Sequence, residues 1–507
     1  MTEDLSGGDL SRLRQLNSLA VINALRGEPA LTLTELAKRT GLSRASTEDV
    51  VRELLGRGWV AEAPAAAGTV GRPARRYRFR ADAGRVLGVD IGGHKVLALV
   101  ADLDGTVLHS VRVAVTPRLG RRQRLAAVDR AVREALAGAG LAAGEVWAVG
   151  AATTGLVDAT GKVMLSEALP EWTGVDVAAH LGRLVPAPVL VENDSKLAAL
   201  AESWCGVARY AKDVVVLLAG LRTGTGLIID GKLHRGFGNA AGEIGALPAS
   251  GWIRAQEHLQ SWPPAAAGAG AGAGVDAGVG ADSGAGPRAG GGTGAGGRSG
   301  VGDNGVVGGA EAGDNGGAAG GDNGVADGAE GGGPGGDAGA AAGLPAGLPN
   351  RPQGADQGVG QGDDQGGGRG RARRGDRTAP PVEDVDAAVE EVFRAARAGD
   401  RRAAAVVRRY VRDLAVGAAA LVLTLDPELV VVGGGFSRSA DLIVEPLRRE
   451  LDRWCIRTPE VRVSEFGDEG VALGALRLAL DHIDRGLREG DGIAAAEHFP
   501  RSRPRSS

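Results

Sequence analysis

Apolar residues near the N-terminus recur every three or four positions and stop at Gly27, which predicts an amphipathic helix. The next stretch, LTLTELAKRTGLSRASTEDVVRELLGRGWV, predicts a short helix, a turn at Gly41 and a second helix that begins after Ser43. Serine is a preferred N-cap, because its hydroxyl accepts a hydrogen bond from a free N–H group of the first turn. The apolar positions of the two helices can pack together, so the pattern indicates a helix-turn-helix core.

The stretch WVAEAPAAAGTVGRPARRYRFR follows and reads as two short strands around a loop rich in glycine and proline. A winged hairpin beside a helix-turn-helix is typical of DNA-binding domains. Arginines on its tip can contact phosphates, and polar residues exposed at the start of the second helix can reach base edges. The DNA-binding candidates are Arg44, Ser46, Thr47, Arg72 and Arg75. The alternative is a small helical interaction module.

From Val86 onward, short runs of valine, leucine and alanine alternate with amphipathic helices, a pattern typical of α/β proteins. The segments VLGVDIGGHKVLALVADLDGTVL and DVVVLLAGLRTGTGLIIDGKL each predict a strand, a glycine-rich turn, a second strand and an Asp-Gly turn. Helices follow both segments. Two such similar units predict an internally duplicated α/β protein.

A long stretch between the α/β segments consists largely of glycine, alanine and aspartate. It has almost no large apolar residues to offset the entropy of ordering, so we expect a disordered insert. The expected domains are a winged helix-turn-helix over 10–82, α/β segments over 85–262 and 381–490, the insert over 263–380, and a disordered tail over 491–507.

Charge and cysteine content exclude several classes of protein. The net charge of -4 predicts no general affinity for polyanions, so any nucleic-acid surface must be local. Cys205 and Cys455 lie far apart, which argues against a disulfide framework and a cysteine-ligated metal. The longest apolar run, AVGAAALVLTL, is too short to cross a bilayer, and the N-terminus lacks the apolar region of a signal peptide. We therefore expect a cytoplasmic protein with no membrane contact, metal or cofactor.

The turn from Asp90 to Lys95 has the layout of a phosphate-binding hairpin. Gly92 and Gly93 would let backbone N–H groups approach a phosphate, and Asp90 can orient a metal or a water molecule beside it. A plain hairpin turn is the alternative, because a glycine pair after a strand is weak evidence by itself.

Two further segments carry candidate chemistry. VENDSKLAALAESWCG places Asn193 and Asp194 between a buried strand and an amphipathic helix. A carboxylate at Asp194 can serve as a general base toward a hydroxyl, whereas Asn193 can equally be a helix cap. Glu243 in AAGEIGA can accept hydrogen bonds from sugar hydroxyls, or it is a surface carboxylate.

Together these stretches resemble the ROK (repressor, open reading frame, kinase) family, in its regulator branch with an N-terminal winged helix. The likeness lies in GVDIGGHK, GLVD, ENDSKLAALAE, DGKLHRGFGNAAGEIGAL and LDPELVVVGGGFS, which follow the family's order. It implies two actin-like (ribonuclease-H-like) lobes with a sugar cleft between them, in a homo-oligomer such as a dimer. It implies sugar binding by Asn193, Asp194 and Glu243, and a degenerate nucleotide site at Asp90, Gly92, Gly93, Gly224, Gly226 and Gly434.

Departures from the family pattern bear on activity. His94 stands where ROK kinases have a threonine, and Leu221 and Arg222 interrupt the second phosphate loop. We expect these side chains to occupy the nucleotide space, which leaves Asp194 as a vestigial general base. The cysteine cluster that holds zinc in other members is missing, so we expect no zinc.

The resemblance and the departures predict a repressor that binds a double-stranded DNA operator, senses a sugar or sugar derivative, and controls carbohydrate metabolism without kinase activity. The alternative is an ATP-dependent hexose kinase with an added DNA-binding domain. A third possibility is a regulator without an effector, because Ala168 and Ala246 stand where the family has sugar-binding side chains.

Overall fold

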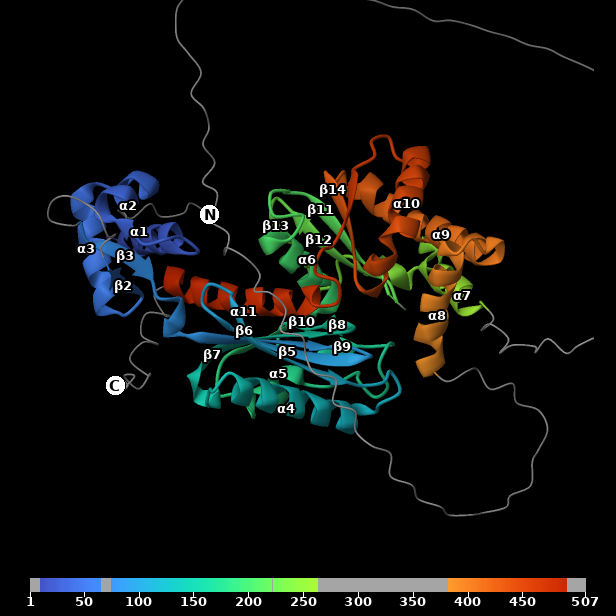
Figure 1. The fold of residues 1–507 in the computed structure, drawn as a ribbon, viewed down its shortest axis with the longest axis horizontal. Coiled ribbons are helices and arrows are strands. Elements are labelled where there is room, and N and C mark those ends of the chain that lie inside the picture. The colour runs from blue at the N-terminus through green and yellow to red at the C-terminus, as the bar shows by residue number, and fades with distance from the viewer. Residues whose placement is uncertain (1–9, 65–73, 221, 263–381, 490–507) are drawn as a thin grey trace, which may run out of the picture. The chain divides into compact units, whose positions relative to one another are not determined.

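The computed structural model describes residues 10–64, 74–220, 222–262 and 382–489 (Figure 1). Its N-terminal part is a helical unit with a three-stranded antiparallel sheet in the order β1–β3–β2. The elements are α1 (Leu10–Leu25), β1 (Leu31–Thr32), α2 (Leu33–Thr40), α3 (Arg44–Gly56), β2 (Val60–Ala63) and β3 (Arg76–Phe79). This arrangement is a winged helix-turn-helix, as the sequence predicts.

Local signals explain the turn between α2 and α3. α2 begins with a capping box in which Thr32 and Glu35 bond to each other's backbone N–H groups. It ends at Gly41, whose φ of 70° favours glycine. α3 begins after Ser43, whose hydroxyl accepts from the backbone N–H of Ser46 at 3.1 Å. The predicted N-cap is therefore confirmed.

The first lobe is built on a five-stranded sheet in the order β10–β7–β4–β5–β6. β4, β5 and β6 are antiparallel neighbours, whereas β7 and β10 run parallel to β4. α4 packs on one face and α11 on the other (Figure 1). The elements are β4 (Arg85–Ile91), β5 (Lys95–Asp102), β6 (Val107–Ala114), α4 (Arg121–Gly138), β7 (Val146–Thr153), β8 (Leu156–Val157), β9 (Val163–Leu165), α5 (Val177–Gly182), β10 (Val189–Asn193) and α11 (Gly470–Glu489).

The second lobe repeats this plan in the order β13–β12–β11–β14–β15, again with three antiparallel strands and then two parallel ones. α7, α9 and α10 pack on one face and α6 on the other. The elements are α6 (Asp194–Cys205), β11 (Val214–Leu218), β12 (Gly224–Ile229), β13 (Lys232–Leu233), α7 (Trp252–Gln260), α8 (Val382–Arg397), α9 (Arg401–Leu425), β14 (Leu429–Gly433), α10 (Ala440–Trp454) and β15 (Glu460–Val463). The shared strand order confirms the predicted duplication and the α/β class.

One apolar cluster joins the winged helix-turn-helix to the first lobe. It combines residues of α1, α3 and β3 with residues of β4, β5 and α11. Trp59 stacks on Phe79 at 6.4 Å and meets Trp147 of β7 edge to face at 5.4 Å. The predicted insert over 263–380 and the tail over 491–507 lie outside the described residues. Among the helices of the described ranges, none is long and apolar enough to span a membrane.

Candidate functional site

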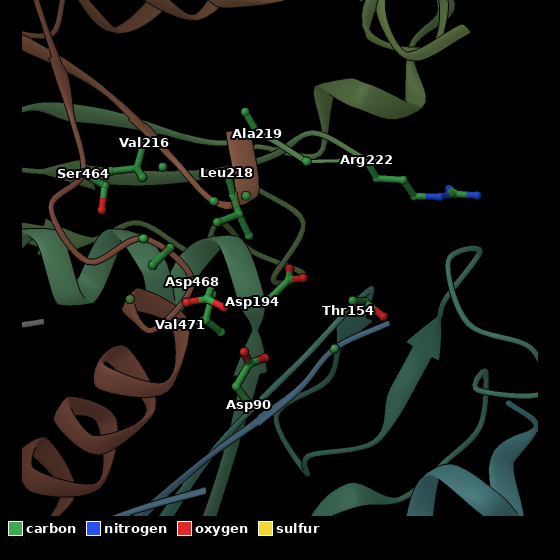
Figure 2. Close-up of a pocket in the computed structure, with 18 of the residues that line it drawn as sticks. Asp90, Thr154, Asp194, Val216, Leu218, Ala219, Arg222, Ser464, Asp468 and Val471 are labelled. Carbon is green, nitrogen blue, oxygen red and sulfur yellow. The ribbon is translucent and has the colours of Figure 1, made fainter. Parts of the chain in front are cut away.

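A cavity of about 200 Å³ lies where the two lobes meet (Figure 2). The first hairpin, the start of α6, the second hairpin, and the loops that follow β14 and β15 all contribute to its wall. The lining residues are Asp90, Gly92, Gly93, Lys95, Thr154, Asp194, Ala198, Glu202, Val216, Leu218, Ala219, Gly220, Arg222, Gly433, Gly434, Gly435, Ser464, Gly467, Asp468, Gly470 and Val471. Segments far apart in the sequence therefore form one site, in which carboxylates stand among glycines and apolar side chains.

Asp194 is the first residue of α6 and reaches into this cavity. Removal from water raises the pKa of Asp194 to about 7, and the charges of Asp90 and Glu243 act in the same direction. Near neutral pH the carboxyl group is therefore about half protonated, so it can either accept or donate a hydrogen bond toward a ligand hydroxyl. A pKa near the working pH also suits a general base.

Asn193 is the N-cap of α6, which was the alternative interpretation of this residue. Its side-chain oxygen accepts from the backbone N–H groups of Ser195 at 3.0 Å and Lys196 at 3.3 Å. Its amide nitrogen donates to the carbonyl oxygen of Gly155 at 3.0 Å. The side chain is only 4% exposed and does not line the cavity. Asn193 thus fixes the start of the helix that carries Asp194, and the sugar-binding role expected for Asn193 stays a prediction.

Hydrogen bonds to other residues of the protein occupy the backbone N–H and carbonyl groups of Gly92 in the first hairpin. The backbone N–H of Gly92 donates to the carbonyl oxygen of Lys95 at 3.0 Å, and the buried Arg124 donates to the carbonyl oxygen of Gly92 at 2.5 Å. Gly92 therefore uses in the turn the N–H group that was expected to approach a phosphate. For this residue the structure supports the alternative of a plain hairpin turn.

The cation of this hairpin is already neutralised by carboxylates. Lys95 lies 3.3 Å from the carboxylate of Asp90 and 3.9 Å from that of Asp468, and it donates to the Asp468 carbonyl oxygen. Burial raises the pKa of Asp90, and the charge of Lys95 opposes this shift. Arg112 donates to Asp468 at 2.5 Å and lowers the pKa of that carboxyl group. A phosphate would have to compete with these carboxylates for Lys95.

The glycines of the second hairpin serve packing. A Cβ on Gly226 would overlap the carbonyl oxygen of Ser195, and one on Gly224 would lie 2.9 Å from the Ser195 Cβ. Neither glycine lines the cavity. These glycines permit the close approach of α6 to β12, and the nucleotide-binding roles expected for Gly224 and Gly226 stay predictions. Gly434 does line the cavity, with a φ of 83°.

The expectation that His94 and Arg222 fill the nucleotide space stays a prediction, and of the two only Arg222 lines the cavity. His94 is exposed and is not part of the cavity wall. Arg222 lies at the rim, where its guanidinium group pairs with the Glu167 carboxylate at 3.4 Å and donates to the Glu167 carbonyl oxygen at 3.1 Å. Figure 2 shows this side chain running away from Asp90 and Asp194. Leu221 lies outside the described residues.

A buried polar network beside Asp194 was not anticipated from the sequence. Glu192 accepts from Arg235 at 2.6 Å and from the Asn239 amide at 2.9 Å. Lys196, fully buried, donates to the Asn239 carbonyl oxygen. Burial lowers the pKa of Lys196, whereas the charges of Glu192 and Glu243 raise it. The signal available in the sequence was the stretch KLAALA of α6, in which Lys196 is followed only by leucine and alanine.

Glu243 lies close enough to this network to act on the charges of both Asp194 and Lys196. Glu243 is exposed to solvent and, unlike Asp194, does not line the cavity. A sugar-binding role for Glu243 beside Asp194 therefore stays a prediction. Among the residues that the structure describes, no group of three or more metal-ligating side chains could hold a metal ion.

The second candidate surface is the start of α3. Arg44 is exposed and donates to the Thr34 hydroxyl at 3.0 Å, and Ser46 is half-buried beside Ser43. Thr47 is fully buried, and its hydroxyl donates to the Ser43 carbonyl oxygen at 2.9 Å. The prediction that Thr47 contacts DNA is therefore wrong, because it shares the inward face of α3 with Val50, Val51 and Leu54.

The wing is described in part. Arg75 is exposed and pairs with Glu62 of β2 at 2.9 Å. Arg72 lies outside the described residues. On α3, the exposed carboxylates of Glu48 and Asp49 pair with Arg52 at 3.4 and 3.0 Å, which reduces their repulsion of a phosphate backbone. The described surface thus offers Arg44, Ser46 and Arg75 to a ligand.

These features define a class: a two-lobed actin-like α/β protein with a cavity between the lobes that carries carboxylates, and with an attached winged helix-turn-helix. The model of the ROK family matches residues 86–272 and 369–482, more than half of the chain, so the protein belongs to the ROK family. A second model, the IclR helix-turn-helix domain, matches residues 16–64. The predicted family and fold class are both confirmed.

Individual relatives include regulators and enzymes. The chain is 24% identical over 239 residues to the xylose repressor of Caldicellulosiruptor bescii, a match that covers 47% of this chain and 60% of that protein. It is 32% identical over 164 residues to the glucokinase of Streptomyces coelicolor, covering 32% of this chain and 49% of the relative. A crystal structure of a ROK family transcriptional regulator, described as a homolog of the E. coli MLC protein, superposes with a TM-score of 0.58 at 15% identity over 95% of this chain and 99% of that one. This last likeness supports the fold.

Proposed function

We propose that this protein is a transcriptional repressor that binds a DNA operator through its winged helix-turn-helix and binds a sugar or sugar derivative in its interlobe cleft. It works as a homodimer, and it acts in the cytoplasm because its DNA operator is located there. The observation that carries this proposal is the position of α3, whose first residues Arg44 and Ala45 are exposed while its face of Thr47, Val50, Val51 and Leu54 is packed inward. Such a helix end is the part that enters the major groove.

The DNA contacts follow from this exposure. Arg44 has the reach and the paired N–H donors to read a guanine edge or hold a phosphate, and Ser46 can donate a hydrogen bond to either. Arg75 on the wing lies on the same unit and suits a phosphate contact. The similarity to xylose repressors supports a regulator that acts through these contacts.

The cleft supports sugar binding better than nucleotide binding. Its wall carries four carboxylates and two cationic side chains, both of which are already paired with carboxylates. The carboxylates are those of Asp90, Asp194, Glu202 and Asp468. A neutral sugar can use carboxylates as hydrogen-bond acceptors, whereas a triphosphate meets repulsion. The proposal therefore includes the loss of kinase activity.

Capture of genomic DNA with the purified protein, in the presence and absence of D-xylose or D-glucose, tests the regulator. We expect enrichment of discrete sites. On an enriched site, Arg44→Ala should weaken binding roughly tenfold or more, because a good base contact contributes about 1–3 kcal/mol. Arg453→Ala, which removes a similarly exposed arginine on α10, is the control and should leave affinity unchanged. Enrichment of no discrete site would remove the proposal.

The second candidate function is an active sugar kinase, favoured by the pKa of about 7 at Asp194 and by the similarity to glucokinases. Incubation with ATP, magnesium and D-glucose distinguishes the two functions. We expect no sugar phosphate above the background of a preparation of Asp194→Asn. Transfer that the wild-type chain performs and this variant does not would establish the kinase instead.

A further inference from the structure

α11 connects the two candidate sites. Its first residues, Gly470 and Val471, line the cleft. Its last turns carry Asp484 and Leu487, which contact the winged helix-turn-helix. Between these ends the helix lies across the sheet of the first lobe (Figure 1). A single rigid element thus reaches from the ligand cleft to the DNA-binding unit.

At the cleft end, α11 packs on its neighbours without intervening side chains. A Cβ on Gly474 would overlap the carbonyl oxygen of Leu197 in α6, the helix that begins with Asp194. On the sheet side, a Cβ on Gly150 of β7 would overlap the carbonyl oxygen of Ala475. Interiors packed to this density transmit displacements, because there is no free volume to absorb them. A shift of α6 therefore has to move α11.

At the other end, a half-buried ion pair ties α11 to the winged helix-turn-helix. Arg26, just after α1, donates to both carboxylate oxygens of Asp484, at 2.8 and 2.7 Å. Its guanidinium group also lies 5.2 Å from the centre of the Phe79 ring in β3. The paired geometry fixes direction as well as distance, so rotation or sliding of α11 changes the position of α1 and the wing strand.

We propose that α11 carries structural change between the cleft and the winged helix-turn-helix, with the Gly474–Leu197 contact as its input and the Arg26–Asp484 pair as its output. The biological meaning of this coupling rests on the proposed function, since it would let a sugar at Asp194 alter DNA binding. The coupling itself is a physical property of the chain. Because coupling is reciprocal, a change at either end must be felt at the other.

Amide hydrogen exchange of the full chain, without DNA or sugar, tests the input contact. Gly474→Ala inserts a methyl group between α11 and α6. We expect roughly tenfold faster exchange in α1, α3 and β3, within the usual range of coupling between sites. Gly417→Ala is the matched control, because its Cβ would overlap the Trp252 indole in the second lobe, away from α11. Both changes add the same methyl group at a helical glycine.

The output contact is tested from the opposite end. Asp484→Asn keeps the shape of the side chain and weakens the pair with Arg26. We expect several-fold faster exchange at the start of α6, whereas Asp129→Asn, which disturbs the pair with Arg133 on α4, on the opposite face of the first sheet from α11, should leave α6 unchanged. This arm decides the question if Gly474→Ala does not fold.

Three results of these exchange measurements would overturn the proposed coupling. Unchanged exchange in α1, α3 and β3 of folded Gly474→Ala, or an equal effect of Gly417→Ala, overturns the coupling. So does an equal effect of the two aspartate variants on α6. None of these measurements needs DNA, so failure to find an operator would remove the regulator but leave the coupling intact.

Discussion

The two junctions of this molecule differ in what they enclose. Between the winged helix-turn-helix and the first lobe, Trp59, Phe79 and Trp147 belong to one continuous apolar contact surface. Between the two lobes, an apolar cluster of α6, α11 and the second sheet borders a cavity lined by carboxylates, glycines and apolar side chains. Apolar contacts lose burial energy when they separate, whereas carboxylates that face a cavity keep their access to water. The first junction is a packed apolar contact, whereas the second leaves a cavity between the lobes.

We expect the largest change in stability at the apolar contact between the winged helix-turn-helix and the first lobe. Trp59→Ala removes a side chain that is 2% exposed, and we expect a loss of about 3–5 kcal/mol in the free energy of unfolding. Urea denaturation measures the change. Trp454→Ala, at a tryptophan that is 41% exposed, should cost much less. Equal costs would show that the junction does not contribute to stability as described.

The next effect distinguishes the two glycine-rich hairpins. Gly226→Ala pushes a methyl group into the Ser195 carbonyl oxygen, and we expect a cost of up to about 3 kcal/mol. Gly92→Ala places its Cβ 3.3 Å from the nearest atom, the carbonyl oxygen of Lys95, and should be tolerated better. Thermal unfolding of the two variants compares them. A greater loss from Gly92→Ala would contradict the packing role of the second hairpin.

The third prediction concerns the pH dependence of the cleft. The pKa of Asp194 is about 7 in the folded chain, above its ordinary value of 3.8, so the folded state holds this proton more tightly than the unfolded state. The contribution of Asp194 to stability is therefore present below about pH 4 and is lost as the pH rises through 7.

Replacing the carboxyl group should remove this loss. Asp194→Asn is expected to be more stable than the wild type at pH 8, by up to about 2 kcal/mol, since one pKa unit corresponds to 1.4 kcal/mol and the cleft is partly open to water. Near pH 4 the two should match. Parallel denaturation curves at both pH values measure the difference, and a stability gain that is independent of pH would argue against a raised pKa.

The smallest effect is expected at the cleft rim. Arg222→Ala breaks an exposed pair with Glu167 and should change stability by less than about 0.5 kcal/mol. Because the guanidinium group is bonded to Glu167 and directed away from Asp90 and Asp194, the variant should not gain affinity for ATP by calorimetry. A new ATP site in Arg222→Ala would mean that this arginine does block a nucleotide after all.

Sequence patterns predicted elements well and side-chain roles less well. Ser43 and Gly41 are local signals, because a cap and a left-handed turn depend on residues within one turn of the chain. Thr47 was assigned to the wrong face of its helix. Its inward position depends on how α3 packs against α1 and α2, which is a tertiary contact and not a property of the helix itself.

The same limit applies in the cleft. Gly224 and Gly226 have the spacing of a phosphate loop, but their open faces are covered by α6. Lysine is a residue type usually found on the surface, yet Lys196 is fully buried and donates a hydrogen bond to the carbonyl oxygen of Asn239. Neither fact can be read from neighbouring residues, because each depends on a second segment that folds against the first.

The family, the α/β duplication and the helix-turn-helix are therefore encoded in periodicity, caps and motif order, which are properties of short stretches. The assembly of the cleft, the direction of Arg222 away from it, and the run of α11 between Asp194 and Arg26 depend on contacts between segments separated by tens to hundreds of residues. Such contacts depend on the packing of the whole interior. A buried charge requires a partner there, and a glycine allows the backbone of another segment to approach closely.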